Sequence, residues 1–148
     1  MAYQIKRHKR VQEELELLDD KGNVIHKLIV DLDADAIAKQ ISEKYLALVN
    51  AQKNMASIQQ DVDNGGYDKA LEIIGTTIVD LFETVFGEDA TKTIVRFYEN
   101  KYIEMCQEVL PFVVNVIIPR VRSVAQESRD QVMQGYNRKQ KRKFGIKK

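Results

Sequence analysis

Three acidic residues carry the spacing of a calcium-binding loop. Asp61, Asp63 and Glu72 take the first, third and twelfth positions of an EF-hand pattern, and Gly66 takes the sixth. The fifth position is Gly65, which offers no side-chain ligand. The same glycine pair is a signal for ending one helix and beginning the next, and we favour that interpretation. We therefore predict no metal site, with Asp61, Asp63 and Glu72 as the alternative.

Few residues could act as a nucleophile or a general base. The chain has one cysteine, Cys106, and two histidines, His8 and His26. Cys106 has apolar neighbours, which predicts a small core residue, and a single cysteine suits a reducing compartment. Neither a Gly-rich phosphate loop nor a local nucleophile–base pattern occurs in the sequence. We expect no catalytic residues, no cofactor and no enzyme activity.

Positive charge is concentrated at the two ends of the chain. Residues 1–10 form a basic arm of charge +4, residues 137–148 a basic tail of +7, and residues 11–136 an acidic body of −10. The tail has too few apolar residues to order itself, so we predict a disordered, solubilising end. Nucleic-acid binding through the tail is the alternative, with steep salt dependence. It would use Arg138, Lys139, Lys141, Arg142 and Lys143.

The body begins with a predicted β-hairpin at 11–32. Val11–Leu18 alternates apolar and polar residues, Asp19–Asn23 has turn chemistry, and Val24–Leu32 is rich in β-branched residues. A helix over Val11–Leu18 is the competing interpretation, because Glu and Leu are good helix formers. A lone hairpin is unstable in water, so we expect it to pack on helices.

Helices fill the rest of the body. The first should start at Asp33 or Asp35 and run to about Asp61. The second should stop at Gly87, and the third should begin at Glu88 and end near Asn100. We predict a mainly α (α+β) fold: one domain, residues 11–136, with the hairpin packed on a bundle of four to five helices.

The last predicted helix starts near Tyr102 and ends by Gly135. Pro111 and Pro119 each remove a backbone donor, so we expect a kink or break at one of them. The run Val109–Ile118 is apolar nearly all round, which fits either a core segment or a partner-binding surface. We predict no signal peptide and no membrane-spanning stretch, and expect a cytoplasmic protein.

The order of these elements and one short run resemble a known family. The run is Asp80–Ala90, with the sequence DLFETVFGEDA, between two predicted helices. Over roughly residues 10–130 the chain resembles the tail assembly chaperones of long-tailed bacteriophages, particularly those of Gram-positive hosts. The resemblance implies a non-catalytic protein of the bacterial host cytoplasm that binds the apolar, helical tape measure protein before the tail tube polymerises.

The resemblance also implies a set of partners. These are the tape measure protein, the chain itself, a longer form made by ribosomal frameshifting, and the tail tube protein. Membranes are not expected as partners, and nucleic acid is expected only under the alternative above. Helix-in-groove binding suits such a role, so we predict two partner-binding faces, with a core position as the alternative for each residue. The candidates are Ile78, Phe82, Val85, Phe86, Phe112, Val113, Val116 and Ile117.

Two other functions remain open. One is a structural phage tail component, such as a completion or connector protein. The other is a small nucleic-acid-associated regulator that uses the basic ends.

Overall fold

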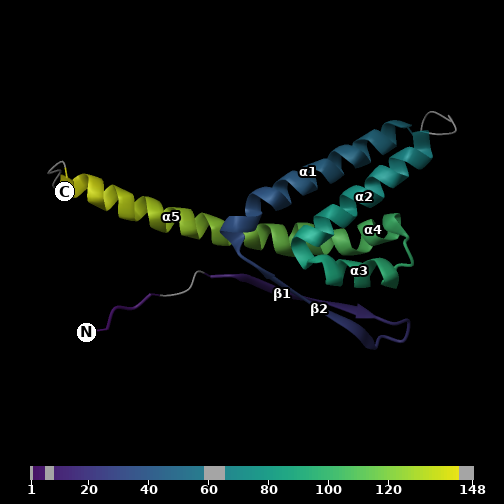
Figure 1. Cartoon of the computed structure of the whole chain (residues 1–148), viewed down its shortest axis with the longest axis horizontal. Coiled ribbons are helices and arrows are strands. Elements are labelled where there is room, and N and C mark those ends of the chain that lie inside the picture. The colour runs from purple at the N-terminus through teal and green to yellow at the C-terminus, as the bar shows by residue number, and fades with distance from the viewer. Residues whose placement is uncertain (1, 6–8, 59–65, 144–148) are drawn as a thin grey trace.

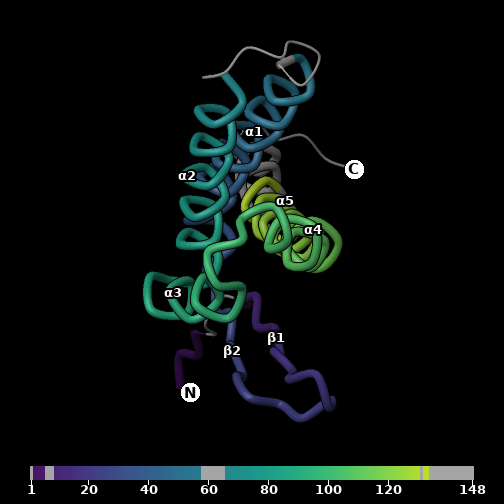
Figure 2. The backbone as a smooth tube through the Cα atoms, turned by 90° about the vertical axis from the view of Figure 1, so that its right-hand side faces the viewer, coloured from purple at the N-terminus to yellow at the C-terminus, as the bar shows by residue number. Residues whose placement is uncertain are grey.

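The predicted hairpin forms as two antiparallel strands. The structure is a computed structural model that describes residues 2–5, 9–58 and 66–143. Strand β1 (Val11–Leu18) pairs with β2 (Val24–Leu32), with Leu15 opposite Leu28. The strands bury one face and expose the other, as the alternation predicts, and a helix over Val11–Leu18 is therefore wrong. Figure 2 shows the hairpin projecting from the helical body with its turn farthest out.

Side-chain hydrogen bonding fixes the turn of the hairpin. The Asp19 carboxylate accepts hydrogen bonds from the backbone N–H groups of Lys21 and Asn23, each at 2.9 Å. The N–H of Asn23 is the main reason that the pKa of Asp19 lies below its ordinary value. Gly22 has φ +86°, a conformation that residues with a Cβ rarely adopt.

Two long helices follow the hairpin and lie side by side. Helix α1 (Ala34–Ile58) begins beside Asp33, whose carbonyl oxygen accepts the N–H of Ile37 at 3.1 Å. Helix α2 (Gly66–Phe86) returns antiparallel to it (Figure 1). The helix start at Asp33 is confirmed. The predicted end near Asp61 lies outside the described residues.

The predicted helix stop at Gly87 is also confirmed. Gly87 has φ 87° and ψ 168°, and α3 (Glu88–Phe97) begins at the next residue with two acids in its first turn. Helix α3 ends three residues before Asn100, earlier than predicted. Glu99 and Asn100 have positive φ angles of 53° and 63°, which turn the chain into the next helix.

At Pro111 and Pro119, where the sequence predicted a kink or break, the helix does not break. Helix α4 (Tyr102–Phe112), a π-helical segment η1 (Val113–Ile117) and α5 (Ile118–Lys143) follow one another without interruption. Buried residues in this run recur every four positions, a longer repeat than the 3.6 residues of an α-helix. A π-helical turn is wider, so η1 keeps the repeat directed at the core. The repeat comprises Met105, Val109, Val113, Ile117, Val121 and Ala125.

Because the helix is continuous across Pro111 and Pro119, the prediction that no stretch could span a membrane has to be corrected. The helical run Tyr102–Asp130 is long and apolar enough to cross a membrane by length and composition, contrary to the sequence-based expectation. One such helix is weak evidence for a span, because core helices of globular proteins meet the same criterion. The four-residue repeat described above places much of its apolar content inside the fold.

Helix α5 also corrects the predicted C-terminal tail. The helix continues through Lys143, whereas the sequence predicted a helix end by Gly135 and disorder from Asn137. Residues 137–143 cannot form a core, but Arg, Lys and Gln are good helix formers. Extending an existing helix avoids the cost of nucleation, so these residues need no core of their own. Figure 1 shows α5 running past all other elements.

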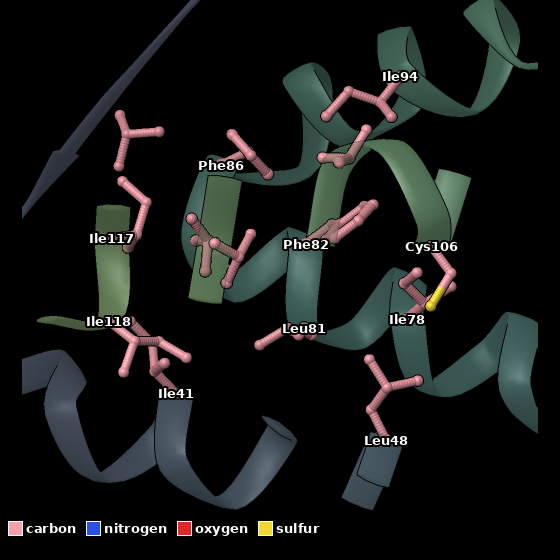
Figure 3. Close-up of a cluster of buried hydrophobic side chains, with 14 of the residues drawn as sticks. Ile41, Leu48, Ile78, Leu81, Phe82, Phe86, Ile94, Cys106, Ile117 and Ile118 are labelled. Carbon is pink, nitrogen blue, oxygen red and sulfur yellow. The ribbon is translucent and has the colours of Figure 1, made fainter. Parts of the chain in front are cut away.

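The core lies where α1, α2, α3 and the α4–η1–α5 helix meet. Ile41, Leu48, Ile78, Leu81 and Ile94 are at most 2% exposed and come from three of these helices. Figure 3 shows them together with Phe82, Cys106, Ile117 and Ile118. Helices make up most of the described residues, and the predicted mainly α (α+β) fold with an N-terminal hairpin on a helical bundle is confirmed.

Candidate partner-binding groove

Most of the residues predicted to bind a partner are in the core. Six of the eight are between 0% and 8% exposed, because the stripe on α2 packs against the α4–η1–α5 helix and α1. They are not a free surface, so the alternative of a core position holds for these six residues. The six are Ile78, Phe82, Val85, Phe86, Val113 and Ile117. Phe112 is half-buried, and Val116 is 37% exposed.

Three phenylalanines join α2 to α4. The Phe86 ring centroid lies 5.7 Å from that of Phe82, edge to face, and 6.1 Å from that of Phe112, stacked. Both arrangements are favourable for aromatic pairs and add to the free energy from apolar burial. The cluster is therefore part of what holds the fold together.

An apolar groove lies on the other side of the same helix. It has a volume of about 320 Å³ and runs between Gln52 of α1 and the α4–η1 boundary. Leu110 and Val114 are half-buried in it, and Pro111 is exposed. The remaining lining residues are Cys106, Gln107 and Asn115.

Two apolar residues of the groove, together with Ile103 outside it, form a strip beside the core stripe. Ile103, Leu110 and Val114 are spaced by seven and four residues, which places them along one side of the helix. Ile103 is 39% exposed. This strip offers apolar side chains to a partner at helical spacing, and it needs no rearrangement of the core.

The thiol at the base of the groove is an unreactive core group. Cys106 is 8% exposed, and Gln52 Nε2 donates a hydrogen bond to its Sγ at 3.2 Å. Burial raises the pKa of the Cys106 thiol, and the Gln52 hydrogen bond opposes this only in part. Because the thiolate is the reactive form, Cys106 is a poor nucleophile at neutral pH.

A larger groove lies between α1 and α5. Its volume is about 540 Å³, and Lys39, Arg122 and Arg129 are among its lining residues. Charged side chains suit an apolar helix less well than the strip at Leu110 and Val114 does. The smaller groove is therefore the better candidate for an apolar ligand.

The other predicted sites are described only in part. Asp61 and Asp63 lie outside the described residues. Glu72 is exposed on α2, which has already begun at Gly66. His26 is exposed on β2, and His8 lies outside the described residues. Over 2–5, 9–58 and 66–143, no group of three or more His, Cys, Asp or Glu residues is placed to hold a metal ion.

The five basic residues proposed for nucleic-acid contact lie in the last turns of α5, where side chains are not described. The backbone there is helical, so a nucleic-acid contact would come from a helix end instead of a disordered tail. These residues are Arg138, Lys139, Lys141, Arg142 and Lys143.

Sequence reasoning did not find the groove. Leu110 and Val114 lie within a run that is apolar nearly all round, so periodicity could not separate its core side from its open side. The available signal was the pair of prolines, which predicted an irregular helix at this place. The wider turn next to Pro111 lies at the groove.

Comparison with known proteins identifies a family. Residues 1–113 match the sequence model of the family described as "Domain of unknown function (DUF8117)". The match covers the hairpin, the first three helices, α4 and the first residue of η1. No curated protein and no solved structure matches the chain.

Proposed function

The chain belongs to the DUF8117 family, and we propose that it is a non-catalytic tail assembly chaperone of a phage or prophage. It binds apolar helices of the tape measure protein in the bacterial cytoplasm before the tail tube forms around them. The observation that carries this proposal is the resemblance of Asp80–Ala90 to such chaperones. In the fold, this run forms the joint between α2 and α3 around Gly87.

The groove beside η1 supplies a surface for this role. A tape measure helix exposes apolar stripes that aggregate when left in water. Covering such a stripe requires an exposed apolar strip with residues at helical spacing. The exposed Ile103 and the half-buried Leu110 and Val114 form a partly exposed strip of this kind, and we place the contact there instead of on the buried faces that the sequence suggested.

Co-expression with a fragment of the tape measure protein tests the proposal. The chain should raise the soluble fraction of the fragment, and Leu110→Glu should remove this effect because it places a charge in the groove. Leu46→Glu is the matched control, since Leu46 is 59% exposed on α1 and does not line the groove. Circular dichroism must show that both variants keep the helix content of the wild type.

Two results would count against this function. A fragment that is equally insoluble with and without the chain removes the chaperone role. If both variants keep their fold but lose the ability to raise the soluble fraction of the fragment equally, the groove is not the binding surface. Phe82→Asp is not a suitable test, because Phe82 is 0% exposed and a charge there would unfold the protein.

The structural-component alternative makes a different prediction. A completion or connector protein would be present in purified particles, and a chaperone would be missing from them. For the nucleic-acid alternative, filter binding at two salt concentrations should show strong salt dependence if the basic ends bind phosphates.

A further inference from the structure

Strand β2 has an unpaired edge. Within residues 2–5, 9–58 and 66–143 the sheet consists of β1 and β2, so each strand has one neighbour. Among the described residues, no backbone hydrogen bond joins β2 to any element other than β1. Free edges of this kind are ready to pair with another strand, and proteins usually block or use them.

The outward face of β2 is both apolar and charged. Ile29 is 63% exposed and lies between Lys27 and Asp31, which point to the same face at two-residue spacing. On the opposite face, Leu28 and Val30 are buried against the helices. The outward sequence is therefore Lys, Ile, Asp, with the apolar residue at the centre.

We propose that β2 pairs antiparallel with β2 of a second copy of this chain, around a two-fold axis at Ile29. In this register Ile29 lies opposite the partner's Ile29. Lys27 lies opposite the partner's Asp31, and Asp31 opposite the partner's Lys27. The two hairpins then form one four-stranded antiparallel sheet, ordered β1–β2–β2–β1, and two exposed edges are removed.

Charge selects this register from the alternatives. A shift by one residue would place Ile29 on the opposite face from its counterpart. A shift by two places Ile29 opposite Lys27 or Asp31, so the two isoleucines no longer meet. A shift by four places Lys27 or Asp31 opposite its own counterpart, and like charges directly opposite are destabilising. The register centred on Ile29 is the one that pairs both charges and both isoleucines.

The edge of β1 fits a second copy less well. Its exposed face carries Glu14 and Glu16, so pairing β1 with β1 in the equivalent way would place carboxylates opposite each other. In the β2 dimer Glu16 has a favourable partner, because it lies opposite Lys27 within each hairpin. Pairing of β2 with β2 also closes after two copies, as isologous contacts do.

Lys27 and Asp31 already form ion pairs within one copy of the chain. Arg10 Nε lies 2.7 Å from Asp31 Oδ1, and Lys27 Nζ lies 3.6 Å from Glu14 Oε2. Both pairs are solvent-exposed, and their side chains keep about half of their surface open. The dimer would add a second opposite charge to Asp31 and to Lys27, giving a row of alternating charge across the four strands.

Analytical ultracentrifugation of the full chain over a wide range of concentrations tests this inference. The wild type should show a monomer–dimer equilibrium. Lys27→Asp and Asp31→Lys should each raise the dissociation constant about tenfold or more, because each creates two like-charge pairs. The double exchange, Lys27→Asp with Asp31→Lys, should lower the dissociation constant again relative to either single variant, since both charge pairs between the two copies are again of opposite charge. Recovery should be incomplete, because each copy loses its own pairs of Lys27 with Glu14 and Glu16 and of Asp31 with Arg10.

Lys39→Asp is the control for the change of charge. Lys39 is exposed on α1, and its substitution should leave the dissociation constant unchanged. A wild type that stays monomeric throughout, a double exchange that dimerises no better than the two single variants, or assemblies larger than two would each overturn the proposal. The inference does not depend on the chaperone role, because it involves the hairpin and not the groove.

Discussion

Replacing Gly87 by alanine tests the joint between α2 and α3. Gly87 has φ 87° and ψ 168°, a region that is essentially restricted to glycine. A Cβ added at this position has no atom within 4 Å, so alanine would meet no steric obstacle from neighbouring residues. The whole cost of Gly87→Ala is therefore backbone strain.

The size of this effect follows from the backbone conformation. Residues forced into such regions lose about 1–3 kcal/mol of stability. For a domain of this length, each kcal/mol lowers the melting temperature by roughly 2–4 °C. Asparagine tolerates the left-handed helical region but not ψ near 168°, so Gly87→Asn should be destabilised about as much as Gly87→Ala.

Urea unfolding followed by circular dichroism measures both variants. The midpoint should fall while the dependence on urea concentration stays unchanged, because no buried surface is lost. Loss of less than about 0.5 kcal/mol in Gly87→Ala would refute the claim that the joint requires a glycine conformation. A large recovery in Gly87→Asn would show that the joint is left-handed helical and not extended as described.

Two further predictions concern the packing around α2 and the titration of buried groups. Gly75→Ala should destabilise the protein by about 1 kcal/mol, because the new Cβ would lie 3.1 Å from Tyr102 Cδ2. In a Tyr102→Ala background the same substitution should instead stabilise the protein by roughly 0.5–1 kcal/mol, because alanine favours helix. Urea unfolding of the wild type, the two single variants and the double variant measures both effects. Burial raises the pKa values of Tyr98 and Cys106, and Glu108 adds to the effect at Tyr98, so the unfolded chain loses these protons first as pH rises. The contribution of these two groups to the free energy of unfolding is complete below the pKa of cysteine in the unfolded chain, about 8.5, and decreases above it. Tyr98→Phe combined with Cys106→Ala should therefore make the free energy of unfolding depend less on pH between about 8.5 and 11. An unchanged slope would contradict the assignment of this pH dependence to Tyr98 and Cys106.

The sequence was sufficient where local chemistry decides structure. Val11–Leu18 alternates with the period of a strand, and this outweighs the helix propensity of its Glu and Leu residues; Gly87 followed by two acids marks a helix stop and start. It was insufficient where two signals compete. Pro111 and Pro119 predict a break, yet a four-residue core repeat favours a continuous helix with a wider turn.

Periodicity also could not assign the apolar stripes to a neighbour. The stripe containing Ile78 and Phe82 looks the same whether it meets this chain or another one. Tertiary packing decides the question, and it covers the stripe with the α4–η1–α5 helix and α1. The groove was missed for the related reason that Leu110 and Val114 differ from their core neighbours only by their angle around one helix.

The segment matched by the family ends where the groove is built. Cys106, Leu110 and Pro111 fall within residues 1–113, whereas Val114 and Asn115 follow them in η1. The core also continues past that point, since Ile117, Val121 and Ala125 are at most 5% exposed. The groove is therefore shaped jointly by the matched segment and by the π-helical turn after it.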